Sequence, residues 1–83
     1  MEGDNLNNEE ILKQLKFELI RAETLHPVFP NTPIKAISII AEECGEAIRE
    51  ANRIEDDRTG NLEDLRKEII QTMATCYRAL KTL

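Results

Sequence analysis

The chain has 83 residues and a formal net charge of −5, with 41% hydrophobic and 4% aromatic residues. A chain of this length can form one small domain with a limited, largely aliphatic core. The acidic balance argues against a protein that holds a nucleic-acid polymer by its phosphates, because that mode of binding needs a basic face. We therefore expect a single all-α domain over residues 1–83 that self-associates.

The two cysteines and the hydropathy pattern indicate where such a protein resides. Cys44 and Cys76 are far apart, form no C-x-x-C pair and fall on apolar stripes, so we interpret them as reduced core residues. No apolar run approaches the ~20 residues that cross a bilayer, and the acidic N-terminus lacks the basic region of a signal peptide. We expect a cytoplasmic protein without a membrane partner.

The first element in chain order is a frayed terminus over residues 1–5, followed by an amphipathic helix to about Leu25. Leu12, Leu15 and Leu19 recur at the three- and four-residue steps of one helix face. Asn7 or Asn8 is suited to cap the helix, because a short polar side chain there can accept a bond from a free backbone N–H.

A proline-rich connector over residues 26–33 separates this helix from the next. Each proline removes a backbone donor and pushes the preceding residue out of the helical region. Thr32 followed by Pro33 predicts a helix start with threonine as N-cap. His26, the one histidine, has no nucleophile beside it and is expected to be a hydrogen-bonded loop residue.

The second helix is predicted from Pro33 to Ile54, with two different faces. One face is an apolar stripe that we expect to be buried, made of Ile37, Ile40, Ala41, Cys44, Ile48 and Ala51. The other face carries Glu42, Glu43 and Glu46 with Ile39 among them, so the acidic side is expected to be partly covered.

The acidic side of this helix has an electrostatic cost. Glutamates three and four residues apart on a helix repel by about 0.2–0.5 kcal/mol per pair. A hard cation such as Mg²⁺ could offset this repulsion, because it prefers oxygen ligands and carboxylates one turn apart can reach a common point. The alternative is a solvated face on which Arg49 and Arg53 neutralise the neighbouring acids.

A polar turn over residues 55–60 leads to a third helix that runs to about Leu83. Asn61 and Asp64 resemble a capping box at its start. Short loops make neighbouring helices antiparallel, so a polar line on the third helix can lie against the acidic side of the second. That line consists of Glu68, Gln71 and Thr75, and the stripe expected to be buried consists of Leu62, Leu65, Ile69, Met73, Cys76 and Leu80.

Two acidic segments resemble a known signature. E-E-C-G-E at residues 42–46 and K-E-I-I-Q at residues 67–71 resemble the E-E-x-x-E … E-x-x-D signature of the MazG-like all-α nucleoside triphosphate pyrophosphohydrolases. The small phage- and prophage-type members are similar also in H-P-x-x-P before the second helix and R-K-E-x-x-Q-T near the start of the third. The resemblance covers residues 26–83, roughly two-thirds of the chain.

The resemblance implies a three-helix chain, with a short extra turn as an alternative, that assembles, as a homodimer or homotetramer, into a MazG-like helical bundle. The implied activity is hydrolysis of a nucleoside triphosphate to a monophosphate and pyrophosphate, with Mg²⁺ as cofactor and Mn²⁺ as the alternative metal. Glu42 or Glu43 would act in catalysis by orienting or deprotonating the attacking water. The implied metal ligands are Glu42, Glu43, Glu46 and Glu68, with Gln71 as a weaker ligand.

Gln71 is the departure from the signature, because the wider family has aspartate there. Its neutral carbonyl oxygen can accept a bond from metal-bound water but supplies no charge, so metal affinity should fall. A non-catalytic helical oligomer that keeps the fold, and with it nucleotide or metal binding, is therefore the second functional class, and a plain interaction module is the third. Basic residues that could meet phosphate, with surface ion pairing as the alternative, are Arg49, Arg53, Lys67 and Arg78.

Overall fold

The computed structural model describes residues 5–83, and this part of the chain is helical without any strand. It consists of α1 (Asn8–Leu25), α2 (Pro33–Asn52), a π-helical turn η1 (Arg53–Asp57) and α3 (Leu62–Thr82). The all-α prediction is confirmed, whereas the frayed terminus expected over residues 1–5 lies almost wholly outside the described residues. None of the described helices has the length and apolarity needed to cross a membrane.

Asparagine caps begin α1 and α3. At α1, the side chain of Asn7 accepts a bond from the backbone N–H of Glu10 (2.8 Å), and the Glu10 carboxylate accepts one from the N–H of Asn7 (3.1 Å). At α3, Asn61 accepts from the N–H of Asp64 (2.8 Å), but the Asp64 carboxylate bonds the Asn61 side chain instead of its backbone. The capping box predicted at α3 is therefore only half formed.

The start of α2 differs from the prediction in its chemistry. Thr32 occupies the N-cap position, yet its side chain makes no capping hydrogen bond. Pro33 at the first position fixes a helical backbone and has no N–H to satisfy, so it sets the start of the helix by itself.

The turn after α2 is more helical than expected. The chain continues as the π-turn η1 through Asp57, and Arg58 then adopts a left-handed conformation with φ 58°. Gly60 lies at a position with little room for a side chain. A Cβ there would lie 3.0 Å from the Cβ of Arg53 and 3.2 Å from Cγ1 of Ile54. Glycine thus allows the chain to pass close to the end of the helix.

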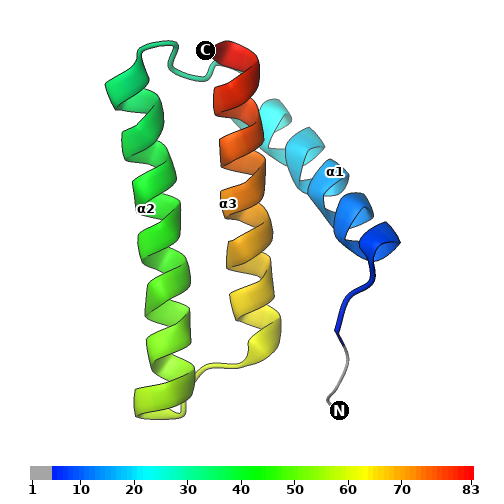
Figure 1. Cartoon of the computed structure of the whole chain (residues 1–83), viewed down its shortest axis with the longest axis vertical. Coiled ribbons are helices and arrows are strands. Elements are labelled where there is room, and N and C mark those ends of the chain that lie inside the picture. Colours follow the sequence, from blue (N-terminus) through cyan, green and yellow to red (C-terminus); the bar gives the residue numbers. More distant parts are fainter. Residues whose placement is uncertain (1–4) are drawn as a thin grey trace.

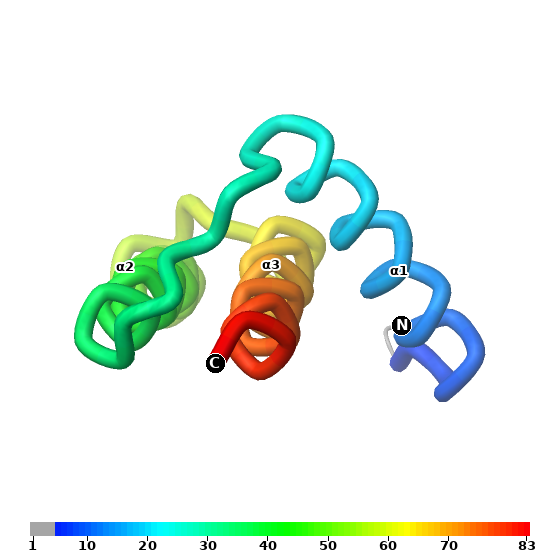
Figure 2. Tube along the Cα trace, turned by 90° about the horizontal axis from the view of Figure 1, so that it is seen from above, coloured from blue at the N-terminus to red at the C-terminus, as the bar shows by residue number. Residues whose placement is uncertain are grey.

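The helices lie in the order α2, α3, α1. Helices α2 and α3 run antiparallel side by side, and α1 packs on α3 and diverges from it toward its own N-terminus (Figures 1 and 2). The small side chains of Ala36, Ala74 and Ala79 are buried, which lets the backbones approach closely. Ile70 is the one large apolar side chain among the described residues that is buried.

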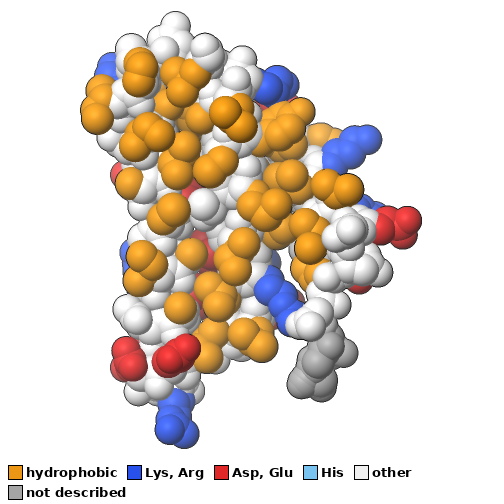
Figure 3. Space-filling view, in the orientation of Figure 1, with side chains coloured by type: hydrophobic (Ala, Val, Ile, Leu, Met, Phe, Trp, Pro, Cys, Tyr) orange, Lys and Arg blue, Asp and Glu red, His pale blue; other side chains and the backbone are white. Residues whose placement is uncertain are grey.

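The apolar stripes of α2 and α3 are not buried within the chain, which corrects the prediction. Ile48 is 61% exposed and Leu80 is 81% exposed, whereas Glu43 and Glu46 are half-buried. The polar line of α3 packs against the acidic side of α2, and a helix that turns one face inward must turn the opposite face outward. Hydrophobic side chains accordingly gather on one open face of α2 and α3 (Figure 3).

The two cysteines follow this orientation. Both thiols are free, as expected, but Cys44 is exposed and Cys76 is half-buried, so neither is a core residue within the single chain. The sequence pattern assigned both cysteines to the correct helix faces, but the prediction that they are buried within the chain was wrong.

Arg78 ties α1 and the connector to α3. Its side chain is buried, and its guanidinium donates to the carbonyl oxygens of Ala22 (3.5 Å) and His26, both at the C-terminal end of α1. The same guanidinium lies over the ring of Phe29, 5.2 Å from its centroid. A cation there satisfies the carbonyl of His26, adds a second donor to that of Ala22, which already accepts the His26 N–H, and offsets the negative end of the helix dipole.

We expect Arg78→Ala to lower the free energy of unfolding by about 2–3 kcal/mol, because it leaves two carbonyls without their charged donor. Urea unfolding measures the change, and Arg78→Lys should fall in between because it keeps the charge but loses the fork. Lys81→Ala is the control, since it removes an exposed ion pair with Glu23 (3.5 Å) and should cost under about 1 kcal/mol. Equal losses in both alanine variants would contradict this role of Arg78.

Candidate functional site

A cleft of about 520 Å³ lies where α1, the connector and the two long helices meet. Its volume falls within the ~300–1,000 Å³ range of small-molecule sites. The polar and charged residues that line it are Glu18, Arg21, His26, Glu42, Glu43, Gln71, Thr75 and Arg78, and the larger apolar ones are Val28, Phe29, Pro30 and Ile39.

Four of the predicted site residues line this cleft, namely Arg78 and three residues of the acidic segments. Glu42 and Glu43 come from α2 and Gln71 comes from α3, which places the departure from the signature beside the two candidate catalytic acids. The pKa of Glu43 is raised above its ordinary value, first by burial and then by repulsion from neighbouring carboxylates, with Glu46 and Glu68 the strongest of these. The ionised form of Glu43 is therefore disfavoured in the folded chain.

Glu46 and Glu68 do not line the cleft but belong to the same α2–α3 contact. One carboxylate oxygen of Glu68, Oε1, is buried without a hydrogen-bond partner. The pKa of Glu68 is raised by burial and then by Glu46 and Glu50, while Arg49 acts in the opposite direction. A buried, unpartnered carboxylate oxygen is an acceptor that a cation or a donor could satisfy.

These carboxylates are close enough to repel one another but are not gathered into one coordination sphere. Within residues 5–83, no three His, Cys, Asp or Glu side chains come near enough to hold a metal ion. The donor set suits Mg²⁺ in kind, since that ion prefers carboxylate and amide oxygens. Binding would require the side chains to turn toward a common point.

The four basic residues predicted near phosphate lie in different places. Arg78 lines the cleft, but its guanidinium already bonds two carbonyls. Arg53 forms a surface ion pair with Glu50 (2.6 Å), and Lys67 lines a separate hollow beside Leu6 and Gln14. Arg49 is exposed and acts electrostatically on Glu68.

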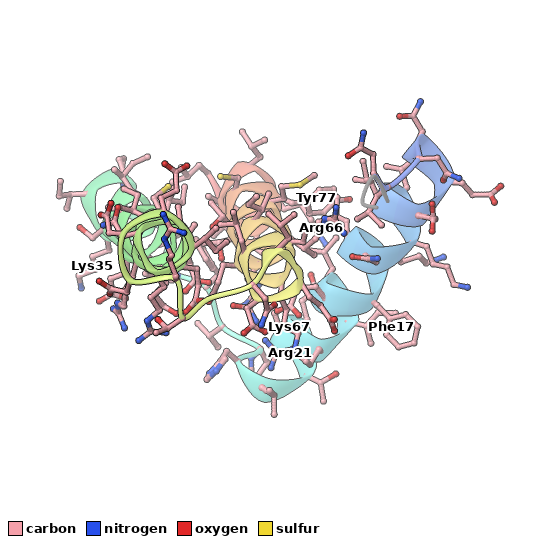
Figure 4. The ribbon with its side chains drawn as sticks, turned by 90° about the horizontal axis from the view of Figure 1, so that it is seen from below. Phe17, Arg21, Lys35, Arg66, Lys67 and Tyr77 are labelled. Atoms are coloured by element: carbon pink, nitrogen blue, oxygen red, sulfur yellow. The ribbon has the colours of Figure 1, made fainter. Side chains whose placement is uncertain are left out.

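Sequence reasoning missed the contribution of α1 and the connector to this cleft. Glu18 and Arg21 line it from α1, where Arg21 lies on the inner side of the helix and Phe17 on the outer side (Figure 4). His26 and Phe29 line it from the connector. His26 is hydrogen-bonded, as expected, through its backbone: its N–H donates to the carbonyl of Ala22 (2.8 Å), and its carbonyl accepts from Arg78.

A second cavity is an apolar groove of about 670 Å³ between α2 and α3, bordered by Leu15 of α1. The exposed stripes of the two helices form it, so it is the hollow part of the face in Figure 3. Its other lining residues are Cys44, Ala47, Ile48, Ile69, Thr72, Met73, Cys76, Tyr77 and Leu80.

Comparisons of the chain with protein-family models, with curated proteins and with solved structures give no match. The resemblance to the MazG-like signature therefore stays a prediction.

We expect Glu68→Gln to raise the melting temperature at neutral pH. The raised pKa of Glu68 means that the folded chain binds this proton more tightly than the unfolded chain does. Protonation of Glu68 therefore stabilises the folded chain below the ordinary glutamate pKa, and this contribution is lost as pH rises through the raised pKa. At neutral pH the ionised Glu68 repels its neighbours, and the amide does not.

Thermal unfolding across pH checks this, and the gain should shrink as pH falls toward the ordinary glutamate pKa, near about 4.3. Glu63→Gln, an exposed position in the first turn of α3, is the control and should give no gain. A Glu68→Gln variant that melts below the wild type at neutral pH would show that the carboxylate is stabilising.

Proposed function

We propose that this chain is a MazG-like, metal-dependent nucleotide pyrophosphohydrolase that cleaves a nucleoside triphosphate to a monophosphate and pyrophosphate. The observation that carries the proposal is the shared cleft, in which Glu42 and Glu43 of α2 face the same space as Gln71 of α3. A cleft of this size with convergent polar groups is suited to a small ligand. The resemblance of the two acidic segments to the MazG-like signature supports the reaction type.

The proposed metal is Mg²⁺ or Mn²⁺, held by Glu42, Glu43, Glu46 and Glu68, with Gln71 contributing through its carbonyl oxygen. The unpartnered oxygen of Glu68 and the mutual repulsion at Glu43 support this assignment, because a cation would relieve both. When bound, the ion would neutralise negative charge on the phosphates and on the leaving pyrophosphate.

Glu43 is the better candidate for the residue that deprotonates the attacking water. Burial is the first cause of its raised pKa and would persist when a cation relieves the repulsion, and a base works best when its pKa approaches the working pH. Glu42, the next residue on α2 and also in the cleft, would orient the water. Water attack at the α-phosphorus would then break the bond to the leaving pyrophosphate.

The test is a screen of pyrophosphate release from ordinary and modified nucleoside triphosphates with Mg²⁺ and Mn²⁺. We expect release from at least one nucleotide, and we expect Glu43→Gln to lower turnover by about 10²–10⁴-fold, the range for loss of a general base. Glu63→Gln should leave turnover unchanged. Equal turnover in the wild type and Glu43→Gln would contradict the assigned role.

A non-catalytic helical oligomer is the second candidate, and two observations favour it. Gln71 removes one charge from the site, and the carboxylates do not converge within the described chain. The Gln71→Asp variant distinguishes the enzyme from the non-catalytic oligomer. An inactive wild type with an active variant would indicate a chain that has lost catalytic activity. An active wild type that binds metal more tightly after Gln71→Asp would indicate an enzyme with a reduced ligand set.

We propose further that the chain works as a homo-oligomer, either a dimer or a tetramer, in the cytoplasm. It exposes 6190 Å², about 1,100 Å² more than the ~5,050 Å² expected of a folded monomer of its mass. A stable interface needs about 800 Å² from each partner. The groove between α2 and α3 is the surface that a second copy would cover, and the free thiols suit a reducing compartment.

We expect sedimentation equilibrium to give a dimer or tetramer at micromolar concentration, and Ile48→Glu to shift it toward the monomer. Ile48 is already exposed in the single chain, so a charge there should disturb association much more than folding. Leu25→Glu is the control, because Leu25 is similarly exposed but lines neither the cleft nor the groove. A folded wild-type monomer would contradict the proposed assembly.

A further inference from the structure

Helix α1 lies outside the segment that resembles a known family, yet it supplies two charged residues to the cleft. Glu18 and Arg21 line the same space as Glu42, Glu43 and Gln71. Any ligand that fills the cleft would therefore meet this pair.

The pair has a defined geometry. The Nε of Arg21 donates to Oε1 of Glu18 at 2.9 Å, and its Nη2 donates to Oε2 at 2.6 Å. This fork uses two of the five N–H donors of a guanidinium, so three remain for a ligand. The Glu18 side chain is 14% exposed and that of Arg21 is 53% exposed, so a largely covered carboxylate holds a cation that solvent and ligand can reach.

Arg21 is the guanidinium of the cleft that can bind an anion. Glu18, Glu42 and Glu43 make this part of the cleft acidic, and a polyphosphate needs a cation to enter it. Arg78 is buried and committed to two backbone carbonyls. None of the other predicted phosphate contacts lines the cleft.

We propose that Arg21 binds a phosphate group of the substrate, and that Glu18 is a positioning residue that holds the guanidinium over the cleft. The proposal rests on the proposed function in one respect, namely that the substrate carries a polyphosphate. A guanidinium suits this role because its planar N–H donors match two phosphate oxygens at once.

The chain contains a matched control for this proposal. Arg53 and Glu50 form a similar ion pair, three residues apart where α2 continues into η1, through one hydrogen bond of 2.6 Å and with side chains 46% and 15% exposed. That pair does not line the cleft. A purely structural role for such a pair would make the two arginines equivalent.

The experiment is calorimetric titration of inorganic tripolyphosphate with Mg²⁺ into the wild type, Arg21→Gln, Arg21→Lys and Arg53→Gln. We expect Arg21→Gln to weaken binding at least tenfold, which is the size of one lost charged hydrogen bond. Arg21→Lys should keep part of the affinity, and Arg53→Gln should bind like the wild type. Unchanged melting temperatures would show that all four proteins are folded.

A second measurement follows the wild type by NMR, where the Nε–H signal of Arg21 should shift on addition of tripolyphosphate while that of Arg53 stays in place. Equal affinity of Arg21→Gln and the wild type for tripolyphosphate, or a larger loss of affinity in Arg53→Gln, would overturn the proposal.

The experiments distinguish failure of the proposed role of Arg21 from failure of the proposed enzymatic function. Binding through Arg21 without hydrolysis of any nucleotide refutes the enzyme alone, whereas hydrolysis that is indifferent to Arg21→Gln refutes the role of Arg21 alone.

Discussion

The contact between the acidic side of α2 and the polar line of α3 is the constraint on which the rest of the structure depends. It partly buries Glu43 and Glu68 and places both near the charge of Glu46, which raises the pKa of Glu43 and of Glu68, and it leaves an oxygen of Glu68 without a partner. It also turns both apolar stripes outward. One choice of helix face therefore creates an electrostatic cost inside the chain and an apolar surface outside it, and both call for something that the single chain does not supply.

The proposed metal would relieve the repulsion between the carboxylates, and the proposed second copy would cover the apolar surface. A cation between the carboxylates would relieve the repulsion at Glu68 that Arg49 only moderates, and Arg53 is already paired with Glu50. A second copy against the groove would bury the stripes that include Ile48 and Leu80. Folding, assembly and activity would then depend on the same helix orientation.

Much of the fold could be predicted because it depends on local chemistry. Asparagine caps, Pro33 at a helix start and the three- and four-residue apolar periods placed all three helices within a few residues. The burial of the stripes could not be predicted in the same way. Periodicity shows which residues share a helix face, but not whether that face meets a neighbour in the same chain or in another one.

The candidate site was predicted only where it depends on a motif. Glu42, Glu43 and Gln71 belong to the acidic segments, whereas Glu18 and Arg21 form an ordinary pair three residues apart until α1 is placed against α3. Arg78 makes that placement by bonding carbonyls more than 50 residues away in sequence, and no local pattern predicts such a contact.

The most direct test of the central claim is a titration of the isotope-labelled protein with substoichiometric Mn²⁺, followed by paramagnetic broadening of its NMR signals. The account predicts that Glu43, Glu46 and Glu68 broaden first and together, because the ion binds between α2 and α3. Broadening that begins at the exposed acids Asp56 and Asp57, or that spreads evenly over the surface, would contradict it.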